Sequence, residues 1–79
     1  MNTAEKYIRI EEIEPAAKTK RWRVFNIRSA ETCGIIKWYG GFRKYVFFPN
    51  DGFLFDHECL QMIADFLRQQ NAQRKKRHD

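Results

Sequence analysis

Positive side chains and aromatic rings recur in this sequence at the two-residue spacing that places side chains on one face of a β-strand. The residues concerned are Arg21, Arg23, Phe25, Lys37, Tyr39, Lys44 and Phe48. On one sheet face the cations would bind phosphates and the rings would stack on bases, as in sheet-based proteins that bind single strands. The set therefore predicts an outer sheet face that binds nucleic acid, either DNA or RNA.

A second group of cations lies near the C-terminus. Its members are Arg74, Lys75, Lys76 and Arg77. These side chains would add phosphate contacts that do not depend on base sequence and that weaken with salt. The alternative interpretation is a short basic tail that only improves solubility.

The histidines and cysteines form no recognisable metal or redox site. Neither His57 nor His78 has a cysteine or carboxylate at the spacing of metal ligands. Cys33 and Cys59 lack a CxxC neighbour, so both are predicted to pack as small apolar residues. Strand alternation places Cys33 on the outer face, where it could be exposed.

Carboxylates gather in the segment before and within the last predicted element. They are Asp51, Asp56, Glu58 and Asp65. A pair of carboxylates can do acid–base chemistry. Because no nucleophile or metal set accompanies them, we expect a protein that is not an enzyme and uses no cofactor.

The stretch Thr32–Pro49 is predicted to form the central β-hairpin. Gly40 and Gly41 would make a two-residue turn, since glycine accepts the positive φ angles that such turns need. In that register Lys37 lies opposite Lys44, where like charges destabilise a sheet. A bound anion would relieve this repulsion, and the alternative is that both side chains extend into water.

The mostly apolar face of this hairpin is predicted to be the core face. It carries Gly34, Ile36, Trp38, Arg43, Tyr45 and Phe47. Gly34 lies mid-strand opposite Phe47, where a glycine marks a bulge or lets a neighbouring ring cover the backbone. Pro49 has no N–H and closes the second strand.

Two further strands precede the hairpin. Lys6–Ile13 alternates apolar and polar residues, which predicts an edge strand that Pro15 ends. Arg21–Arg28 directs Trp22 to the core face and Arg21 to the outer face. Asn26 in this strand is expected to hydrogen-bond the backbone of the following loop.

A C-terminal helix is predicted over residues 57–72. Asp56 fits its N-cap, and Glu58 in the first turn suits the helix dipole. Apolar residues recur at spacings of three and four, namely Cys59, Leu60, Met62, Ile63, Phe66 and Leu67. Phe53–Phe55 before the helix is predicted to be a strand fragment or a plug against the core, and residues 73–79 a basic tail.

A sheet with one apolar face and a helix with one apolar stripe bury these surfaces against each other. The predicted fold is α+β, an antiparallel β-meander of three to four strands packed on one C-terminal α-helix. One domain would span residues 1–79, with a frayed segment at 1–5 and the sheet within 6–55.

The net charge of +5 and the pI near 9.5 indicate anionic partners. The charge is uneven along the chain: residues 16–48 carry +7 and residues 49–67 carry −4. Two isolated cysteines fit a reduced, cytoplasmic protein. We expect neither a signal peptide nor a membrane span, because no apolar run in the sequence is long enough for a span.

Four motifs, WxVxN, GxIxWY, RxYxFxP and LxxIxxF, follow one another between Trp22 and Phe66. Together they resemble a group of small bacterial and bacteriophage-encoded proteins of unassigned function. The resemblance implies this fold and a bacterial or phage origin, and it implies no catalytic residues.

Three hypotheses for the function follow. The first is nucleic-acid binding through the outer face and the basic tail. The second is a protein-binding module, such as a phage accessory factor that inhibits a host protein, because separated acidic and basic surfaces suit electrostatic recognition. The third is a structural homodimer through the outer face, which the apolar residues Ile27, Ile35 and Val46 on that face favour.

Overall fold

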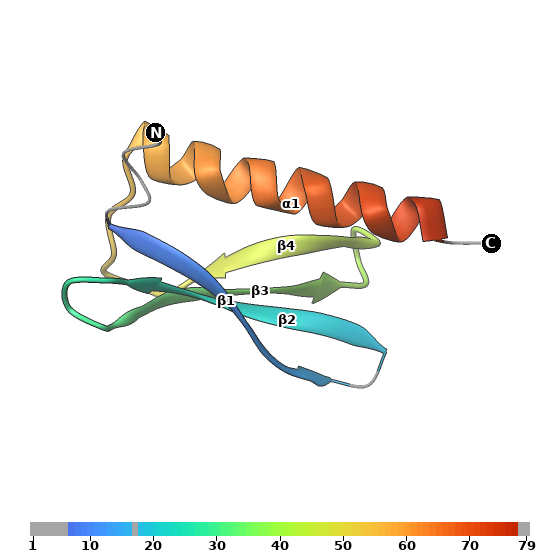
Figure 1. Cartoon of the computed structure of the whole chain (residues 1–79), viewed down its shortest axis with the longest axis horizontal. Coiled ribbons are helices and arrows are strands. Elements are labelled where there is room, and N and C mark those ends of the chain that lie inside the picture. The colour runs from blue at the N-terminus through green and yellow to red at the C-terminus, as the bar shows by residue number, and fades with distance from the viewer. Residues whose placement is uncertain (1–6, 17, 78–79) are drawn as a thin grey trace.

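The computed structural model describes residues 7–16 and 18–77, which form one sheet and one helix (Figure 1). The elements are β1 (Ile8–Ala16), β2 (Thr19–Asn26), β3 (Thr32–Tyr39), β4 (Lys44–Pro49) and α1 (His57–Arg77). The strands pair in the order β1-β2-β3-β4, and every pair is antiparallel. The α+β meander with one C-terminal helix is therefore confirmed, and β1 is an edge strand as expected.

The β3–β4 hairpin differs from its predicted register. Tyr39 pairs with Lys44, and Lys37 pairs with Val46, so the loop contains four residues rather than two. Arg43 has a φ of 57° at the end of this loop. The predicted Lys37–Lys44 pair is wrong, because the true register is displaced by two residues along β4.

Pro15 does not end the first strand. β1 continues to Ala16, which pairs with Thr19, and a register irregularity lies between Ile13 and Ala16. An edge strand tolerates proline there because one side of the strand needs no N–H for pairing. The connection to β2 is consequently shorter than the predicted loop.

A bulge in β3 changes the position of one predicted outer-face residue. Val24 pairs with Gly34 and Phe25 with Thr32, so Cys33 is the extra residue of the bulge. Cys33 is only 3 % exposed and belongs to the core cluster. The placement of Cys33 on the outer face is wrong because the bulge interrupts the alternation of side chains, whereas its predicted packing as a small apolar residue is confirmed.

Gly34 lies within this bulged region, under a neighbouring ring. The ring of Phe47 approaches the position where a Cβ of Gly34 would stand. This confirms the expectation of a covering ring, although the strand partner of Gly34 is Pro49 and not Phe47.

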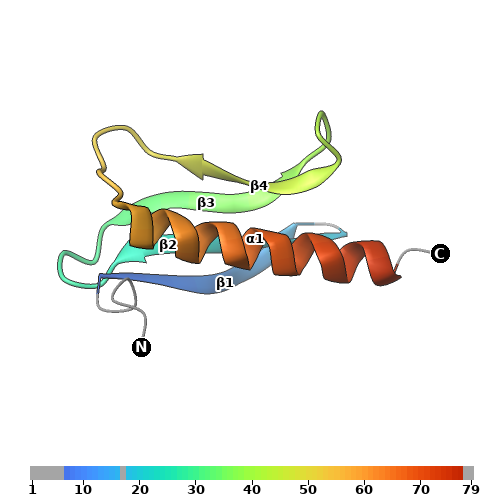
Figure 2. The ribbon, with the colours of Figure 1, turned by 90° about the horizontal axis from the view of Figure 1, so that it is seen from above.

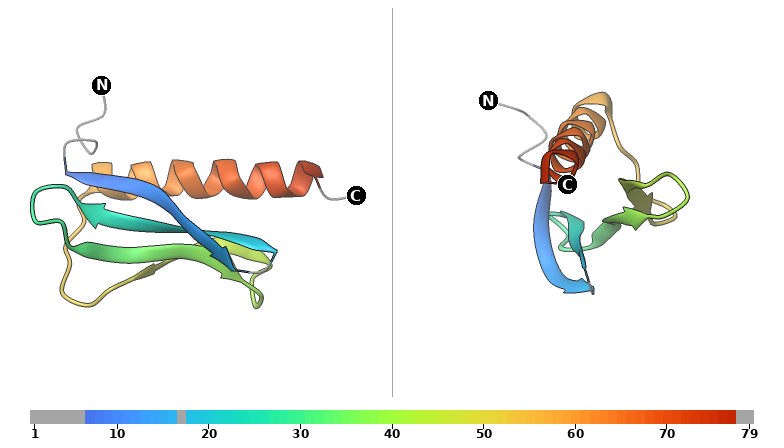
Figure 3. Two further views of the ribbon diagram at one scale, coloured as in Figure 1. Left: turned by 60° about the horizontal axis from the view of Figure 1, so that its bottom comes forward. Right: turned by 90° about the vertical axis from the view of Figure 1, so that its right-hand side faces the viewer.

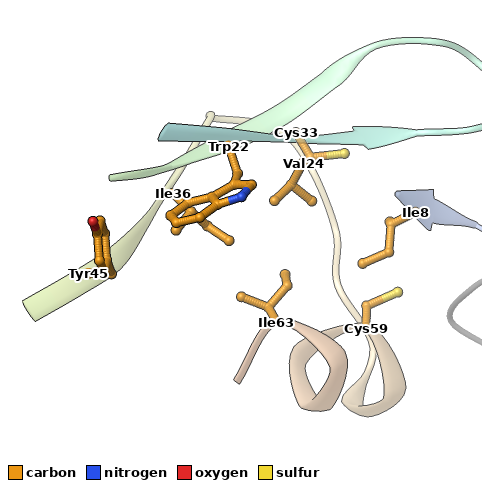
Figure 4. Packing of buried hydrophobic residues seen from close by; sticks show 8 residues of the cluster. All are labelled: Ile8, Trp22, Val24, Cys33, Ile36, Tyr45, Cys59 and Ile63. Carbon is orange, nitrogen blue, oxygen red and sulfur yellow. The ribbon is translucent and has the colours of Figure 1, made fainter. Parts of the chain in front are cut away.

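The core lies between the sheet and α1 (Figure 4). The indole of Trp22 makes edge-to-face contacts with Tyr45 of β4 and Phe66 of α1, with ring centroids 5.2 and 5.0 Å apart. Ile36 and Val24 are fully buried beside it. One aromatic ring thus joins β2, β4 and the helix.

The helix begins as predicted and ends later. The backbone N–H of Cys59 donates to Oδ1 of Asp56 at 2.8 Å, which is the N-cap geometry. The helix continues to Arg77 rather than stopping at residue 72, so most of the expected basic tail is helical. The segment 1–6 and residues 78–79 lie outside the described residues.

Two loop expectations are resolved by side-chain contacts. Oδ1 of Asn26 accepts hydrogen bonds from the backbone N–H groups of Arg28 and Ser29, as expected for this loop. Phe53 and Phe55 pack against the core without forming a strand, so this segment is a plug.

Candidate nucleic-acid interface

The helix lies lengthwise over one face of the sheet and leaves the other face uncovered by any described element (Figures 2 and 3). The uncovered face is the outer face. The register places there the seven residues predicted to bind nucleic acid, which are Arg21, Arg23, Phe25, Lys37, Tyr39, Lys44 and Phe48. The displacement of β4 by two residues does not change this, because side chains alternate with a period of two.

An aromatic cluster with a cation forms the β3–β4 part of the outer face. The ring of Tyr39 contacts Phe42 and Phe48 edge-to-face, with centroids 4.9 and 6.2 Å apart. Nζ of Lys37 lies 4.8 Å from the centroid of Phe48. Tyr39 is 42 % exposed and Phe42 is 66 % exposed. Exposed rings can stack on bases, and the ammonium group beside them can bind a phosphate.

Arg21 and Lys37 are the like-charged pair of this face. They lie directly opposite each other in the β2–β3 register. Nη2 of Arg21 donates to the backbone carbonyl of Glu14 at 3.0 Å. Nε of Arg21 is buried and has no hydrogen-bond partner within the described residues. Two adjacent cations, one of which has an N–H without a hydrogen-bond partner, can bind an anion between them.

Arg23 has closer partners on its own sheet. Its Nη2 lies 3.5 Å from Oε1 of Glu11, and its guanidinium lies over the ring of Phe25 at 4.6 Å. Both side chains of the ion pair are 40 % exposed or more, so the pair contributes about 0–1 kcal/mol. Arg23 and Phe25 therefore lie on the β1–β2 part of the outer face, where Glu11 balances the charge of Arg23.

Arg74 is the predicted C-terminal cation whose side chain the structure describes, and it lies on the helix side of the sheet. The guanidinium of Arg74 lies over the ring of Trp38 at 4.3 Å, and Trp38 packs against the core on the helix side. The backbone of Lys75, Lys76 and Arg77 continues α1, and their side chains lie outside the described part of the structure.

One end of the molecule gathers basic residues that the sequence analysis did not select. Figure 1 shows the β1–β2 turn, the β3–β4 loop and the C-terminal end of α1 at the same end. The exposed cations there are Lys18, Lys20, Arg43, Lys44 and Arg74. A meander brings alternate turns to one end, so the positions of Lys18 and Arg43 in the first and third turns were a usable signal.

The opposite end carries acidic residues. The turn from β4 to α1 lies there, with Asp51 and the N-cap Asp56, and Glu58 follows in the first helical turn. Among residues 7–16 and 18–77, no three His, Cys, Asp or Glu side chains lie close enough to hold a metal ion. Nor is any helix in this range long and apolar enough to cross a membrane.

A curated protein of similar size matches most of this chain. Over 61 residues the chain is 33 % identical to the "Uncharacterized 9.3 kDa protein" of Acholeplasma phage L2. The match covers 77 % of this chain and 78 % of the phage protein. No family model matches the chain, and no solved structure matches it. The match agrees with the resemblance to small phage-encoded proteins of unassigned function.

Proposed function

Since this chain belongs to the family of the 9.3 kDa protein of Acholeplasma phage L2, we propose that it is a small non-enzymatic phage-type protein that binds single-stranded nucleic acid. The binding surface is the outer face of the sheet, centred on Lys37 and Tyr39. Phosphates contact the cations of this face, and unpaired bases stack on its rings.

The observation that carries this proposal is the cluster of Tyr39, Phe42, Phe48 and Lys37. Large rings usually leave water, yet Tyr39 and Phe42 stay 42 % and 66 % exposed beside an ammonium. Base–aromatic stacking contributes about 1–3 kcal/mol per base. A duplex hides the faces of its bases, so such a platform favours single strands.

The basic end of the molecule supports the same proposal. Lys44 belongs to both the outer face and this end, so a strand that leaves the rings there remains close to further cations. Neutralising several phosphates makes the affinity fall steeply as salt rises.

A titration with labelled oligonucleotides tests the proposal. Fluorescence anisotropy is measured for single-stranded and double-stranded oligonucleotides at two salt concentrations. We expect single strands to bind more tightly than duplexes and to dissociate as salt rises. Absence of binding at low salt would remove the proposal.

The double variant Lys37→Glu/Lys44→Glu locates the surface. It should reduce the dependence of log affinity on log salt by about one per lysine. A matched control is Arg28→Glu/Arg68→Glu, which makes the same charge change at the β2–β3 turn and on α1. Equal losses in both variants would show a nonspecific effect of net charge.

Phe42→Ala separates stacking from charge. Phe42 lies in the β3–β4 loop and is largely exposed, so its loss should leave folding intact. We expect about tenfold weaker binding of single strands, near the lower limit for a lost stack, with an unchanged salt dependence. Unchanged affinity would exclude this ring from the interface.

A second candidate function is a protein-binding accessory factor. Leu54 is 97 % exposed and Leu60 is 50 % exposed, both in the acidic stretch before and within α1. Exposed leucines surrounded by carboxylates suit a partner with an apolar, basic surface. Pull-down from host lysate should then recover one protein with the native chain and not with Leu54→Ser/Leu60→Ser.

A further inference from the structure

We propose that β1 is an interaction edge for a second copy of this chain. In this dimer the two β1 strands pair antiparallel about a twofold axis at Ile10, and the sheet continues from one copy into the other. This inference concerns the strand edge and does not depend on the proposed function of the outer face.

The two edges of the sheet differ in how their backbone groups are satisfied. On β4, Oδ1 of Asn71 accepts from the N–H of Tyr45 at 2.7 Å, and Nδ2 of Asn71 donates to its carbonyl at 3.2 Å. Pro49, further along this edge, has no N–H. The helix therefore blocks strand addition at β4.

No described residue covers the β1 edge in a comparable way. The N–H of Ile27 donates to the carbonyl of Tyr7 at 2.8 Å, which fixes the phase of the β1–β2 ladder. Because antiparallel strands alternate, the backbone groups of Ile8, Ile10 and Glu12 point away from β2. No side chain within residues 7–16 and 18–77 is seen to bond them.

A groove of about 450 Å³ runs beside this edge, between β1 and α1. It is lined by Ile8, Arg9, Ile10, Met62, Asp65, Phe66 and Gln69. A strand added to β1 directs alternate side chains toward this groove. If the added strand is another β1 with Ile10 opposite Ile10, its Ile10 side chain enters a groove already lined by isoleucines, methionine and phenylalanine.

The charges of β1 select this occupant and one register. With Ile10 opposite the partner's Ile10, Arg9 faces the partner's Glu11, and Glu11 faces the partner's Arg9. These residues form non-hydrogen-bonded pairs, in which side chains approach most closely. The twofold axis makes both ion pairs together.

Neighbouring registers lack this complementarity. A displacement of two residues in one direction places Arg9 opposite the partner's Arg9, and in the other direction Glu11 opposite the partner's Glu11. Like charges in such positions are destabilising. A displacement by one residue would turn the isoleucines away from the groove.

The oligomeric state of the native chain is the first test. Light scattering and sedimentation are measured without nucleic acid over a range of concentrations. The paired segment is short, so we expect a reversible monomer–dimer equilibrium with modest affinity. A monomer up to millimolar concentration would overturn the proposal.

Single charge reversals test the register. Arg9→Glu and Glu11→Arg each turn two attractive pairs into two repulsive pairs. Each should raise the dimer dissociation constant about tenfold or more. Arg43→Glu makes the same charge change as Arg9→Glu in the distant β3–β4 loop and should leave the dimer unchanged.

A mixture of the two variants gives the decisive measurement. In a mixed dimer, Glu at position 9 of the first variant faces Arg at position 11 of the second. Glu at position 11 of the first variant faces Arg at position 9 of the second. Both pairs are attractive, so native mass spectrometry should detect the mixed dimer. Asp51→Arg is the matched partner for comparison, because it reverses an exposed acid in another turn and keeps the native β1. Mixed with Arg9→Glu, it should still pair with itself but form little mixed dimer, since Glu at position 9 would then face Glu at position 11. If the native chain dimerises and neither charge reversal changes the dimer dissociation constant, the assignment of the interface to β1 is overturned.

Loss of this dimer and loss of nucleic-acid binding are distinguishable. Dimerisation is measured without nucleic acid, and Lys37, Tyr39 and Phe42 remain intact in every edge variant. If the chain dimerises but binds no oligonucleotide, the β1 dimer is supported and the proposed function is contradicted.

Discussion

At Gly34 the β3 bulge and the ring of Phe47 leave no space for a side chain. A Cβ there would lie 2.5 Å from the carbonyl oxygen of Phe48 and 2.6 Å from the Phe47 ring. We expect Gly34→Ala to lower the free energy of unfolding by ~1–3 kcal/mol, measured by urea denaturation. Gly40→Ala is the matched control, because nothing lies within 4 Å of its Cβ position. Equal stabilities of the two variants would contradict this packing.

Asp56 makes the stability of the helix start depend on pH. The backbone N–H of Cys59 donates to the Asp56 carboxylate and lowers the pKa of this group below its ordinary value. A lowered pKa in the folded state gives stability that is present above the ordinary pKa. This stability is lost as the pH falls through the folded-state pKa. Thermal unfolding should therefore show a drop in Tm under acidic conditions.

Asp56→Asn isolates this contribution. Asparagine caps helices about as well as aspartate but does not titrate. The variant should remain folded at neutral pH and lose less Tm than the native chain below about pH 4. Parallel pH profiles of the two proteins would show that the cap carboxylate is not responsible.

Among the elements, β2 and β3 bring two cations together on the outer face. Arg21 pairs directly with Lys37, and like charges in this position are unfavourable. A double-mutant cycle with Arg21→Met and Lys37→Met should give an unfavourable coupling of about 0.2–1 kcal/mol in unfolding free energy. Added inorganic phosphate should reduce it.

The matched cycle uses Lys37→Met and Lys44→Met. These residues are not paired in the observed β3–β4 register, so their coupling should be close to zero. A coupling larger than that of Arg21 with Lys37 would instead support the two-residue turn.

The helix and β4 are joined by the amide of Asn71. It replaces the missing neighbour strand by bonding both backbone groups of Tyr45. We expect Asn71→Ala to lower the free energy of unfolding by about 1–3 kcal/mol, since both groups lose their partner. Asn71→Asp keeps an acceptor for the N–H and loses the donor. Its free energy of unfolding, measured by denaturant titration, should therefore lie between those of the native chain and Asn71→Ala.

At the scale of the whole molecule, both thiols are closed to solvent. Cys33 and Cys59 are 3 % and 7 % exposed. Burial, and secondarily the charge of Glu31, raises the pKa of Cys33; burial, and secondarily the hydrogen bond with Asp56, raises the pKa of Cys59. Because the thiolate is the reactive form, a thiol reagent should label the native chain slowly and both cysteines at once in denaturant. Rapid labelling of the native chain would contradict this core.

The uneven charge along the chain becomes a separation between the two ends of the fold. The turn containing Lys18 and the loop containing Arg43 lie at the same end of the molecule as the C-terminal end of α1, while Asp51 and Asp56 lie at the opposite end. Sequence blocks alone indicated basic and acidic segments. Their positions at opposite ends follow from the meander, which returns alternate turns to the same end.

Local patterns in the sequence determined which face the strand residues outside the β3 bulge occupy, the N-cap at Asp56 and the start of the helix. These features depend on side chains a few residues apart, so a period of two or of three and four is sufficient. The set of seven outer-face residues was predicted for the same reason.

Only the tertiary structure decided the β3–β4 register, the burial of Cys33 and the role of Asn71. A displacement of two residues keeps every side chain on its face, so the alternation of β3 and β4 cannot distinguish the loop of four residues from the turn of two. The bulge at Cys33 and the hydrogen bonds between Asn71 and Tyr45 depend on contacts between elements, and such contacts leave no periodic signal in the sequence.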